Sequence, residues 1–359
     1  MTKVLYLTNI ETPYRVHFFN ELAKVCDLTV MYERRKSANR NATWASSVQK
    51  TFNVEFLDGK EIGNEYSFSF GITKILKRTW DVVIVGCYNS YVQIFAMMYM
   101  KLHKIPYIVN LDGEQFFDNG LKSAIKRMLL KSGDAILAAG VKSACTTSNA
   151  INGKKTVYPY HFSSLSDAEI IGNGQTTTVQ REDYVLVVGQ YFDYKGMDVA
   201  FRVACKDRSI RYKFVGLGSR TEQFISDMGC IPDNIEIIPF LQKEDLNNEY
   251  KRCALMLLPT RQECWGLVVN EAASFGTPIV STYGSGAAVE FLSDKYTKYL
   301  AEPNDVDSLY SCVRQCFADN STEYSEYLKA FSRNYSIERS VSLHAELINR
   351  FSNNVKDKG

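Results

Sequence analysis

The stretch over residues 257–282, LLPTRQECWGLVVNEAASFGTPIVST, constrains the fold of this chain more than any other. It begins at the end of the apolar run 254–258, whose length and following proline predict a buried strand. Helical apolar spacing follows over residues 265–275, and Gly-Thr-Pro ends that helix before a new strand begins at residue 279. This strand–loop–helix–strand succession is typical of a parallel sheet, whose ligands bind where strands end and helices begin.

Two carboxylates, Glu263 and Glu271, lie eight residues apart in this stretch. Eight residues amount to ~800° of helical rotation, so on an unbroken helix both side chains would share roughly one side. Between them lie Gly266, Leu267 and Val268, whose amides fall at the expected helix N-terminus. Unpaired N–H groups and the helix dipole favour a diphosphate there. The two carboxylates could then bind hydroxyls on either side of it, an arrangement that a nucleoside-diphosphate sugar offers.

This pattern resembles the signature of family 4 retaining glycosyltransferases of the GT-B fold. Glu263-x7-Glu271 is accompanied by Gly266 after the first Glu and by Gly276-Thr277-Pro278 after the second. The spacing alone also arises by chance, and it would then describe only a charge at a helix start and a solvated helix face. The resemblance implies transfer of a sugar from a nucleoside diphosphate to a hydroxyl, with retention at the anomeric carbon and without metal or other cofactor. It also implies two Rossmann-like α/β domains facing each other across a cleft, with a C-terminal helix that crosses back to the N-terminal domain.

Length and composition exclude several alternatives. A chain of 359 residues suits two domains of ~150–180 residues, and 45% hydrophobic with 23% charged residues is typical of a soluble globular protein. A net charge of +2 argues against a general nucleic-acid binder. Nine cysteines without CxxC pairs favour a reducing, cytoplasmic compartment over a disulfide framework. The start shows no signal-peptide pattern, and the longest apolar stretch, residues 92–100, is far shorter than the ~20 residues of a membrane span.

The βα pattern predicts the division of the chain. Apolar strands over residues 3–8 and 28–32 flank a helical pattern over 14–24, a start typical of a doubly wound domain. A segment rich in Ser, Thr, Gly and Asn follows residue 162 and predicts a linker. The pattern predicts domains over residues 1–165 and 183–335 with a linker over 166–182. The resemblance implies that the first domain binds the acceptor, that the second binds the nucleotide sugar, and that a helix over 336–359 returns to the first domain.

Candidate acceptor contacts follow two strands of the first domain. Tyr14 and Arg15 come after the first strand, in a loop where family members often carry glycines, and the alternative is an ordinary first helical turn. Asp112 and Glu114 follow the predicted strand 105–111. Many relatives have a catalytic histidine at about this position that contacts the transferred sugar. The resemblance therefore places Asp112 near the reacting carbon and Glu114 among the acceptor contacts, and the alternative is an Asp-Gly turn.

Residues 120–131, GLKSAIKRMLLK, have apolar side chains on one face and basic ones mainly on the other. Such a helix can lie on an anionic membrane, and the alternative is a surface helix that covers the sheet. The opening of the chain, a strand followed by TPYR-x-x-F-F-N-E-L, resembles enzymes that build bacterial surface polysaccharides on a polyprenyl carrier. Such acceptors lie at the inner face of the cell membrane, so we expect a cytoplasmic protein with peripheral membrane contact.

The second domain contains a further phosphate element. Gly189 and Gln190 follow the predicted strand 183–188, and Lys195-Gly196 comes five residues later. This resembles the family's Gly-Arg-Leu…Lys-Gly element, whose Arg and Lys clamp the diphosphate. Lys195 matches the Lys, whereas Gln190 replaces the Arg, so the bidentate guanidinium fork is lost. Arg261, just before Glu263, is the candidate for the missing cation.

The resemblance implies a role for each candidate. Glu271 would bind the ribose hydroxyls, Glu263 the sugar hydroxyls, and Lys195 the phosphates, with Glu263, Lys195 and Asp112 forming the catalytic set. The expected donor-binding residues are Gly189, Gln190, Lys195, Gly216, Gly218, Arg261, Glu263, Gly266, Leu267, Val268 and Glu271. UDP sugars are favoured as donors, with GDP sugars as the alternative, and the acceptor would be a saccharide or a lipid-linked saccharide.

Two other function classes remain open. A nucleotide-sugar epimerase on the same fold would need acid and base residues of its own. A non-catalytic partner subunit is suggested by Gln190 and Asp112, which stand where family catalysis prefers Arg and His.

Overall fold

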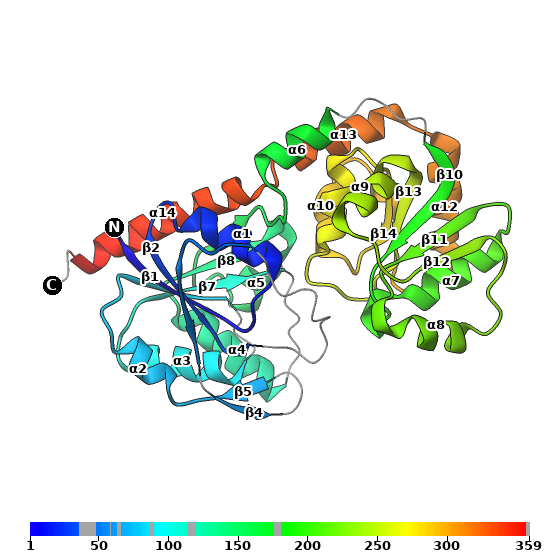
Figure 1. Cartoon of the computed structure of the whole chain (residues 1–359). Coiled ribbons are helices and arrows are strands. Elements are labelled where there is room, and N and C mark those ends of the chain that lie inside the picture. The colour runs from blue at the N-terminus through cyan, green and yellow to red at the C-terminus, as the bar shows by residue number, and fades with distance from the viewer. Residues whose placement is uncertain are drawn as a thin grey trace. The chain divides into compact units, whose positions relative to one another are not determined.

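The computed structural model describes residues 1–35, 48–57, 59–62, 66–86, 90–113, 120–175 and 181–356 (Figure 1). Contacts divide the chain into two compact units. Unit 1 comprises Met1–Ser164 with Ile337–Gly359, and unit 2 comprises Leu165–Ser336.

Unit 1 is built on a parallel sheet with the strand order β3-β2-β1-β6-β7-β8-β9. These strands are β1 (Lys3–Thr8), β2 (Asp27–Tyr32), β3 (Asn53–Phe56), β6 (Val82–Val85), β7 (Tyr107–Leu111), β8 (Ala135–Ala139) and β9 (Val157–Tyr160). Its helices are α1 (Pro13–Leu22), α2 (Ile72–Leu76), α3 (Tyr91–Leu102), α4 (Leu121–Ser132), α5 (Gly140–Ala150) and α14 (Ile337–Lys356). Every side chain of β6 and β8 is buried, as expected for strands that helices cover on both faces. A short antiparallel hairpin, β4 (Lys60–Ile62) and β5 (Tyr66–Phe68), is an addition that the sequence pattern did not predict.

The C-terminal helix α14 packs along α1, so the first and last helices of the chain lie side by side in unit 1 (Figure 1). Its apolar side chains Val341, Leu347 and Ile348 are buried. The predicted return of the C-terminal helix to the first domain is confirmed.

Unit 2 is built on a second parallel sheet with the order β12-β11-β10-β13-β14-β15. Its strands are β10 (Glu182–Val188), β11 (Arg211–Val215), β12 (Ile235–Ile238), β13 (Cys253–Leu258), β14 (Ile279–Thr282) and β15 (Leu300–Ala301). Its helices are α6 (Asp167–Gly174), α7 (Met197–Lys206), α8 (Thr221–Met228), α9 (Lys243–Arg252), α10 (Leu267–Ser274), α11 (Gly286–Leu292), α12 (Val306–Asp319) and α13 (Thr322–Ser332). The apolar runs that predicted β10 and β13 form adjacent central strands. The α/β class predicted for both halves is confirmed.

The predicted linker 166–182 is wrong in part, because its first half forms helix α6. Ser166 and Glu169 form a capping box at the start of this helix, and each binds the backbone N–H of the other. Asn173 then donates a hydrogen bond to Ser274 Oγ of α10 (2.9 Å). The Ser-x-x-Glu signature was present in the sequence, but the surrounding Gly and Asn concealed it.

Candidate active site

The loops that follow β10 and β13 lie side by side, because the two strands are neighbours in the sheet. The carbonyl oxygen of Tyr194 accepts hydrogen bonds from Thr260 Oγ1 (2.7 Å) and from the backbone N–H of Arg261 (2.8 Å). Gly196 has a φ of +68°, and a Cβ at this position would lie 2.1 Å from the carbonyl oxygen of Pro259. Only glycine fits this close approach, which fixes Lys195 against the second loop.

Lys195 and Glu263 form an ion pair between these two loops. Their side chains are 18% and 16% exposed, so a ligand can still reach both. The backbone of Glu263 is fixed on its other side, because its N–H donates to the carbonyl oxygen of Gly284 (2.8 Å). Glu263 Oε2 is buried and has no hydrogen-bond partner among the described residues. The pair therefore places a cation and an unused acceptor together at the carboxyl ends of β10 and β13.

The N-terminus of α10 lies beside this acceptor. Gly266 is the N-cap with φ +105°, and no side chain caps the helix. A Cβ on Gly266 would lie 3.5 Å from Glu263 Oε2, so the carboxylate and the helix start are immediate neighbours. The first amides of the helix, those of Leu267 and Val268, have no capping side chain and suit an anion.

Helix α10 begins at Leu267, two residues later than the sequence pattern predicted. Glu263 therefore lies on the loop, where it pairs with Ser285, and the argument that an unbroken helix turns Glu263 and Glu271 to one side does not apply. Glu271 alone is on the helix and accepts a hydrogen bond from the hydroxyl of Tyr250 (3.0 Å). Tyr250 comes from α9 and is fully buried; burial and the neighbouring Glu271 carboxylate raise the pKa of its phenol, which stays a donor. No pattern in the sequence points to Tyr250 as the partner of Glu271.

The glycine turn that follows β11 lies against the loop after β10, which carries Lys195. Gly216 and Gly218 have φ values of +89° and +66°. A Cβ on Gly216 would lie 3.8 Å from the backbone of Gly189, and a Cβ on Gly218 would lie 3.8 Å from Gln190 Nε2. The structure thus brings these four predicted donor residues together.

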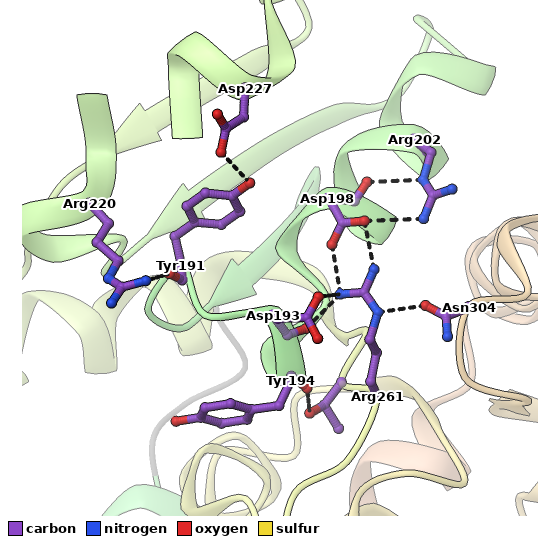
Figure 2. A network of polar contacts seen from close by, with 10 residues as sticks. Tyr191, Asp193, Tyr194, Asp198, Arg202, Arg220, Asp227, Arg261 and Asn304 are labelled. Atoms are coloured by element: carbon purple, nitrogen blue, oxygen red, sulfur yellow. Dashed lines mark hydrogen bonds and ion pairs between the residues drawn. The ribbon is translucent and has the colours of Figure 1, made fainter. Parts of the chain in front are cut away.

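Arg261 does not have the free guanidinium that the prediction requires (Figure 2). Its Nη1 and Nη2 donate to the two carboxylate oxygens of Asp198 (2.8 and 2.7 Å), and Nη1 also donates to the carbonyl oxygen of Asp193 (2.5 Å). Its Nε donates to Asn304 Oδ1 (2.6 Å). Hydrogen bonding to Asp198 raises the pKa of Arg261 further above its ordinary value. A phosphate would have to displace Asp198 from the guanidinium. Arg261 therefore links neighbouring segments of unit 2 and does not replace the missing arginine.

Arg220 is a second guanidinium that the sequence reading did not single out. It comes two residues after Gly218, and its Nη1 donates to the carbonyl oxygen of Tyr191 at 3.5 Å (Figure 2). Tyr191 directly follows Gln190 in the chain. The guanidinium carbon of Arg220 lies 4.3 Å from the ring centroid of Phe192. The sequence feature that could have identified Arg220 is its position two residues after Gly218, the second glycine of the Gly-x-Gly turn.

In unit 1, the structure brings Arg15 and Asp112 together as an ion pair. Arg15 is only 4% exposed, and burial is the largest single influence on its pKa and lowers it; the Asp112 carboxylate, together with the neighbouring tyrosines, nevertheless raises the pKa of the guanidinium above its ordinary value. A side chain so deeply buried has no surface for an acceptor, so its prediction as a direct contact is corrected. Tyr14 is half-buried, with its ring 6.0 Å from that of Phe162. Glu114 lies outside the described residues.

Further partners of Asp112 come from distant parts of the chain. Asn110 Nδ2 (2.9 Å) and the hydroxyl of Tyr160 (3.2 Å) donate to Asp112 Oδ1. Asn110 Oδ1 lies 2.6 Å from His344 Nε2 of α14, and Nδ1 of the same ring lies 2.7 Å from the carbonyl oxygen of Ser340. Burial lowers the pKa of His344 to about 4. No sequence pattern links residues 110 and 344.

Among the described residues, no cluster of three or more His, Cys, Asp or Glu side chains could hold a metal ion. Nor does any helix in that part of the chain have both the length and the apolar character that crossing a bilayer requires.

Comparison with known proteins agrees with this geometry. Residues 173–335 match the family model for glycosyl transferases group 1. A relative from Haemophilus influenzae, named an uncharacterized glycosyltransferase, is 28% identical over 166 residues, which cover 44% of this chain and 46% of the relative. The O-antigen chain mannosyltransferase C of Escherichia coli is 23% identical over 247 residues, 64% of this chain and 65% of that protein. The chain spans about half the length, or less, of the first curated relatives that it matches.

Solved structures match over nearly the whole chain. HepE of Anabaena, solved in complex with UDP, has a TM-score of 0.71 at 14% identity and covers 97% of this chain and 100% of that one. A sucrose-phosphate synthase from Thermosynechococcus elongatus has a TM-score of 0.70 at 12% identity and covers 98% and 99%. At such identities the likeness concerns the fold alone, and it confirms the predicted GT-B fold.

Proposed function

We propose that this protein is a retaining glycosyltransferase that moves a hexose from a nucleoside diphosphate to a hydroxyl of a saccharide. The observation that carries the proposal is the arrangement at the start of α10. There, the Lys195–Glu263 pair, a buried carboxylate oxygen without a partner and an uncapped helix N-terminus adjoin one another. The match of residues 173–335 to the family model for glycosyl transferases group 1 supports the same reading.

The donor's diphosphate would bind Lys195 and the amides of Leu267 and Val268. A cation and helix amides both stabilise negative charge, and their contribution grows as the bond to the sugar breaks. Glu271 would accept hydrogen bonds from the ribose hydroxyls, held in place by Tyr250. We favour a UDP sugar over a GDP sugar, because the structurally similar HepE was solved with UDP.

In the transfer step, the bond between the anomeric carbon and the diphosphate breaks. A bond to the acceptor oxygen forms on the same face, and the acceptor's proton leaves with the diphosphate. Glu263 Oε2, which has no partner among the described residues, would accept a hydrogen bond from a hydroxyl of the moving sugar. Asp112 would lie near the reacting carbon. Lys195 and the helix dipole would supply the positive charge, so we propose a reaction without metal or other cofactor.

The acceptor we propose is a saccharide, free or linked to a polyprenyl carrier, in the synthesis of a bacterial surface polysaccharide. The similarity to the O-antigen chain mannosyltransferase C of Escherichia coli supports this class. The protein would work in the cytoplasm at the inner face of the membrane, with no role in nucleic-acid binding.

Helix α4 supports membrane contact. Leu121 is 79% exposed, and Ile125 and Met128 are exposed on the same helix. Arg127 and Lys131 of α4 line a surface hollow together with Lys101 of the neighbouring helix α3. Exposed apolar side chains beside cations are what an anionic lipid surface attracts. Flotation with vesicles of phosphatidylglycerol in phosphatidylcholine, compared with phosphatidylcholine alone, tests the contact; equal binding to both would argue against it.

The first experiment on function is a thermal-shift screen against UDP, GDP, ADP, CMP and their sugars in the presence of EDTA. We expect one nucleotide to raise the melting temperature, and the rise to be lost in Glu271→Ala. Transfer from the matching nucleotide sugar to saccharide acceptors is then measured, again with EDTA. Donor binding without transfer or hydrolysis would favour a non-catalytic subunit instead, and conversion of the donor without an acceptor would favour an epimerase.

A further inference from the structure

Arg181 directly precedes β10, and its guanidinium lies where the C-terminal ends of two helices of unit 2 meet. Its Nη1 and Nη2 donate hydrogen bonds to five backbone carbonyl oxygens, those of Tyr250 (3.1 Å), Lys251 (3.4 Å), Cys253 (3.0 Å), Phe275 (3.3 Å) and Gly276 (3.0 Å). The first two belong to the last turn of α9, the third begins β13, and the last two directly follow α10. One side chain therefore joins three elements.

The charge of Arg181 faces helix ends rather than a carboxylate. No carboxylate in the described part of the chain forms an ion pair with it, and burial lowers the pKa of its guanidinium. Arg261 differs in this respect, because hydrogen bonding to Asp198 raises its pKa. The last carbonyl oxygens of a helix have no partner within the helix and carry its partial negative charge. Arg181 therefore stabilises the C-terminal ends of α9 and α10 at once.

These two helix ends carry the tyrosine and the carboxylate of the expected ribose contact. The carbonyl oxygen of Tyr250 also accepts from Thr277 Oγ1 (2.5 Å), and its ring stacks on that of Phe275 with the centroids 6.1 Å apart. The hydroxyl of Tyr250 donates to Glu271 Oε2 (3.0 Å). Glu271 lies four residues before Phe275, which is about one helical turn. The relative position of Tyr250 and Glu271 therefore depends on how Arg181 holds the two ends.

The N-terminal end of α10 is held by different contacts. The carbonyl oxygen of Trp265, two residues before the helix, accepts from Ser285 Oγ (3.0 Å) and from the backbone N–H of Ala287 (2.9 Å). These contacts lie at the opposite end of the helix from Arg181, about 12 Å away for eight residues. We therefore expect the first amides of α10 to keep their place when Arg181 is changed, whereas Glu271 should move.

We propose that Arg181 is a positioning residue for the ribose-binding carboxylate. It holds the C-terminal ends of α9 and α10 together, and so keeps Glu271 at the hydroxyl of Tyr250 and directed at the ribose hydroxyls of the donor. The inference rests on the proposed function, because Arg181 acts through Glu271 in that same site. Loss of Arg181 should weaken recognition of the ribose and leave the phosphate contacts in place.

The first test compares UDP with 2′,3′-dideoxy-UDP, which lacks the hydroxyls that Glu271 would bind. Arg181→Lys keeps the charge but donates from a single nitrogen, so it cannot bridge all five carbonyl oxygens. In isothermal titration calorimetry, we expect Arg181→Lys to bind UDP about 3- to 10-fold more weakly than the wild type, because a contact to a charged acceptor is misplaced. The loss should fall below about twofold for dideoxy-UDP, and for UDP in a Glu271→Ala background, because that contact is already absent there. If the thermal-shift screen selects GDP, GDP and its dideoxy form replace them.

Steady-state kinetics separate positioning from folding. A merely structural role would lower the fraction of folded protein, and with it kcat, while KM for the nucleotide sugar stayed unchanged. For Arg181→Lys we expect the opposite, with KM raised about 3- to 10-fold and kcat within about twofold of wild type. Arg181→Met removes all five hydrogen bonds and should raise KM further; if it does not fold, Arg181→Lys carries the test.

Arg252→Met is the matched control. Arg252 ends α9 and is a neighbouring cation, but its partner is the carboxylate of Glu182, and its side chain is 48% exposed. The substitution removes the same charge from the same helix end without releasing α10. It should keep the wild-type KM and the wild-type preference for UDP over dideoxy-UDP.

The outcomes separate this inference from the proposed function. Equal losses for UDP and dideoxy-UDP in Arg181→Lys would overturn the positioning role and leave the function standing. A lowered melting temperature with unchanged affinity for UDP would do the same, because Arg181 would then only stabilise the fold. A wild-type protein that binds no nucleoside diphosphate and transfers no sugar would overturn the proposed function, and this inference with it.

Discussion

The two units place charged residues at the carboxyl ends of their sheets in different ways. In unit 2 the residues come from two short segments, 189–196 and 259–271, and glycines bring backbone amides and one lysine to the same point. In unit 1 the cluster joins Arg15, Asp112, Tyr160 and, through Asn110, His344. A phosphate site made of backbone and tight turns leaves a pattern in the sequence. A cluster made of side chains from distant segments leaves none.

The charges of the two clusters differ as well. The Lys195–Glu263 pair is partly exposed and lies beside a helix N-terminus, so a ligand can exchange with either partner. The Arg15–Asp112 pair has a buried cation, so only the carboxylate can meet a ligand. We therefore expect changes in unit 2 to alter phosphate binding and turnover, and changes in unit 1 to alter stability and the recognition of hydroxyls.

The largest effect we expect is that of Lys195→Met on turnover. Loss of one preorganised charge that stabilises a leaving group costs about 10²–10³ in kcat. The free energy of unfolding should fall by about 1–3 kcal/mol, because the Glu263 carboxylate is only 16% exposed and loses its partner. Both are measured on the same preparation, by transfer assay and thermal unfolding. The matched control is Lys206→Met on helix α7, which breaks a more exposed ion pair, that with Asp307 of α12, and should keep wild-type turnover. A turnover within threefold of wild type in Lys195→Met would contradict the proposed role of Lys195 in stabilising the leaving diphosphate.

The second prediction concerns acid stability, and it is specific to unit 1. The pKa of His344 is about 4 in the folded protein against an ordinary value of 6.5. The unfolded chain therefore binds this proton more readily, and stability is lost as the pH falls from about 6.5 to about 4. The loss amounts to about 3 kcal/mol for a shift of this size.

Chemical denaturation between pH 4 and 8 measures this loss directly. His344→Gln should remove most of the acid-induced fall, while His103→Gln, an exposed histidine of the same unit, should keep it. Parallel curves for His344→Gln and the wild type would mean that the imidazole of His344 titrates equally in the folded and unfolded chains.

The donor site shows how far sequence reasoning reaches. Apolar periodicity located the central strands, and the motif around Glu263 located the helix start beside them. Sequence reasoning failed for Arg261. Its closeness to Glu263 in the chain does not reveal that its guanidinium is hydrogen-bonded to Asp198. Sequence reasoning also missed Tyr250, whose role depends on how α9 packs against α10. Patterns fix backbone placement, whereas the partners of long side chains depend on tertiary packing.

The third prediction concerns the ribose contact. Glu271→Ala should weaken the binding of the nucleoside diphosphate about 10- to 100-fold, because a charged acceptor for hydroxyl donors is removed. Tyr250→Phe keeps the carboxylate but removes the hydroxyl that orients it, so a smaller loss, about 3- to 10-fold, is expected. Isothermal titration calorimetry gives both values. The 2′-deoxy nucleotide tests the assignment further. The wild type should bind it more weakly than the ribonucleotide, and this difference in affinity should be smaller in Glu271→Ala. Unchanged affinity in Glu271→Ala would remove the ribose role.

The smallest effect we expect is a gain, in Gln190→Arg. Position 190 lies beside the Gly218 turn, where an arginine would present a two-pronged donor to a phosphate. A charged hydrogen bond contributes about 1.5–3 kcal/mol, but ordering a long side chain costs up to about 2 kcal/mol, so the net gain should be about 1 kcal/mol, or roughly fivefold in affinity.

The gain should appear with the nucleoside diphosphate and be absent with the nucleoside, because only the phosphates meet the new charge. It should also decrease as salt is added. Gln190→Lys, which adds a point charge without the fork, is the control and should gain less. An equal gain for nucleoside and nucleotide would place the new side chain away from the phosphates. No gain at all would mean that the phosphates already have a second cation, and Arg220, which donates to the carbonyl oxygen of Tyr191, would be the residue to replace next.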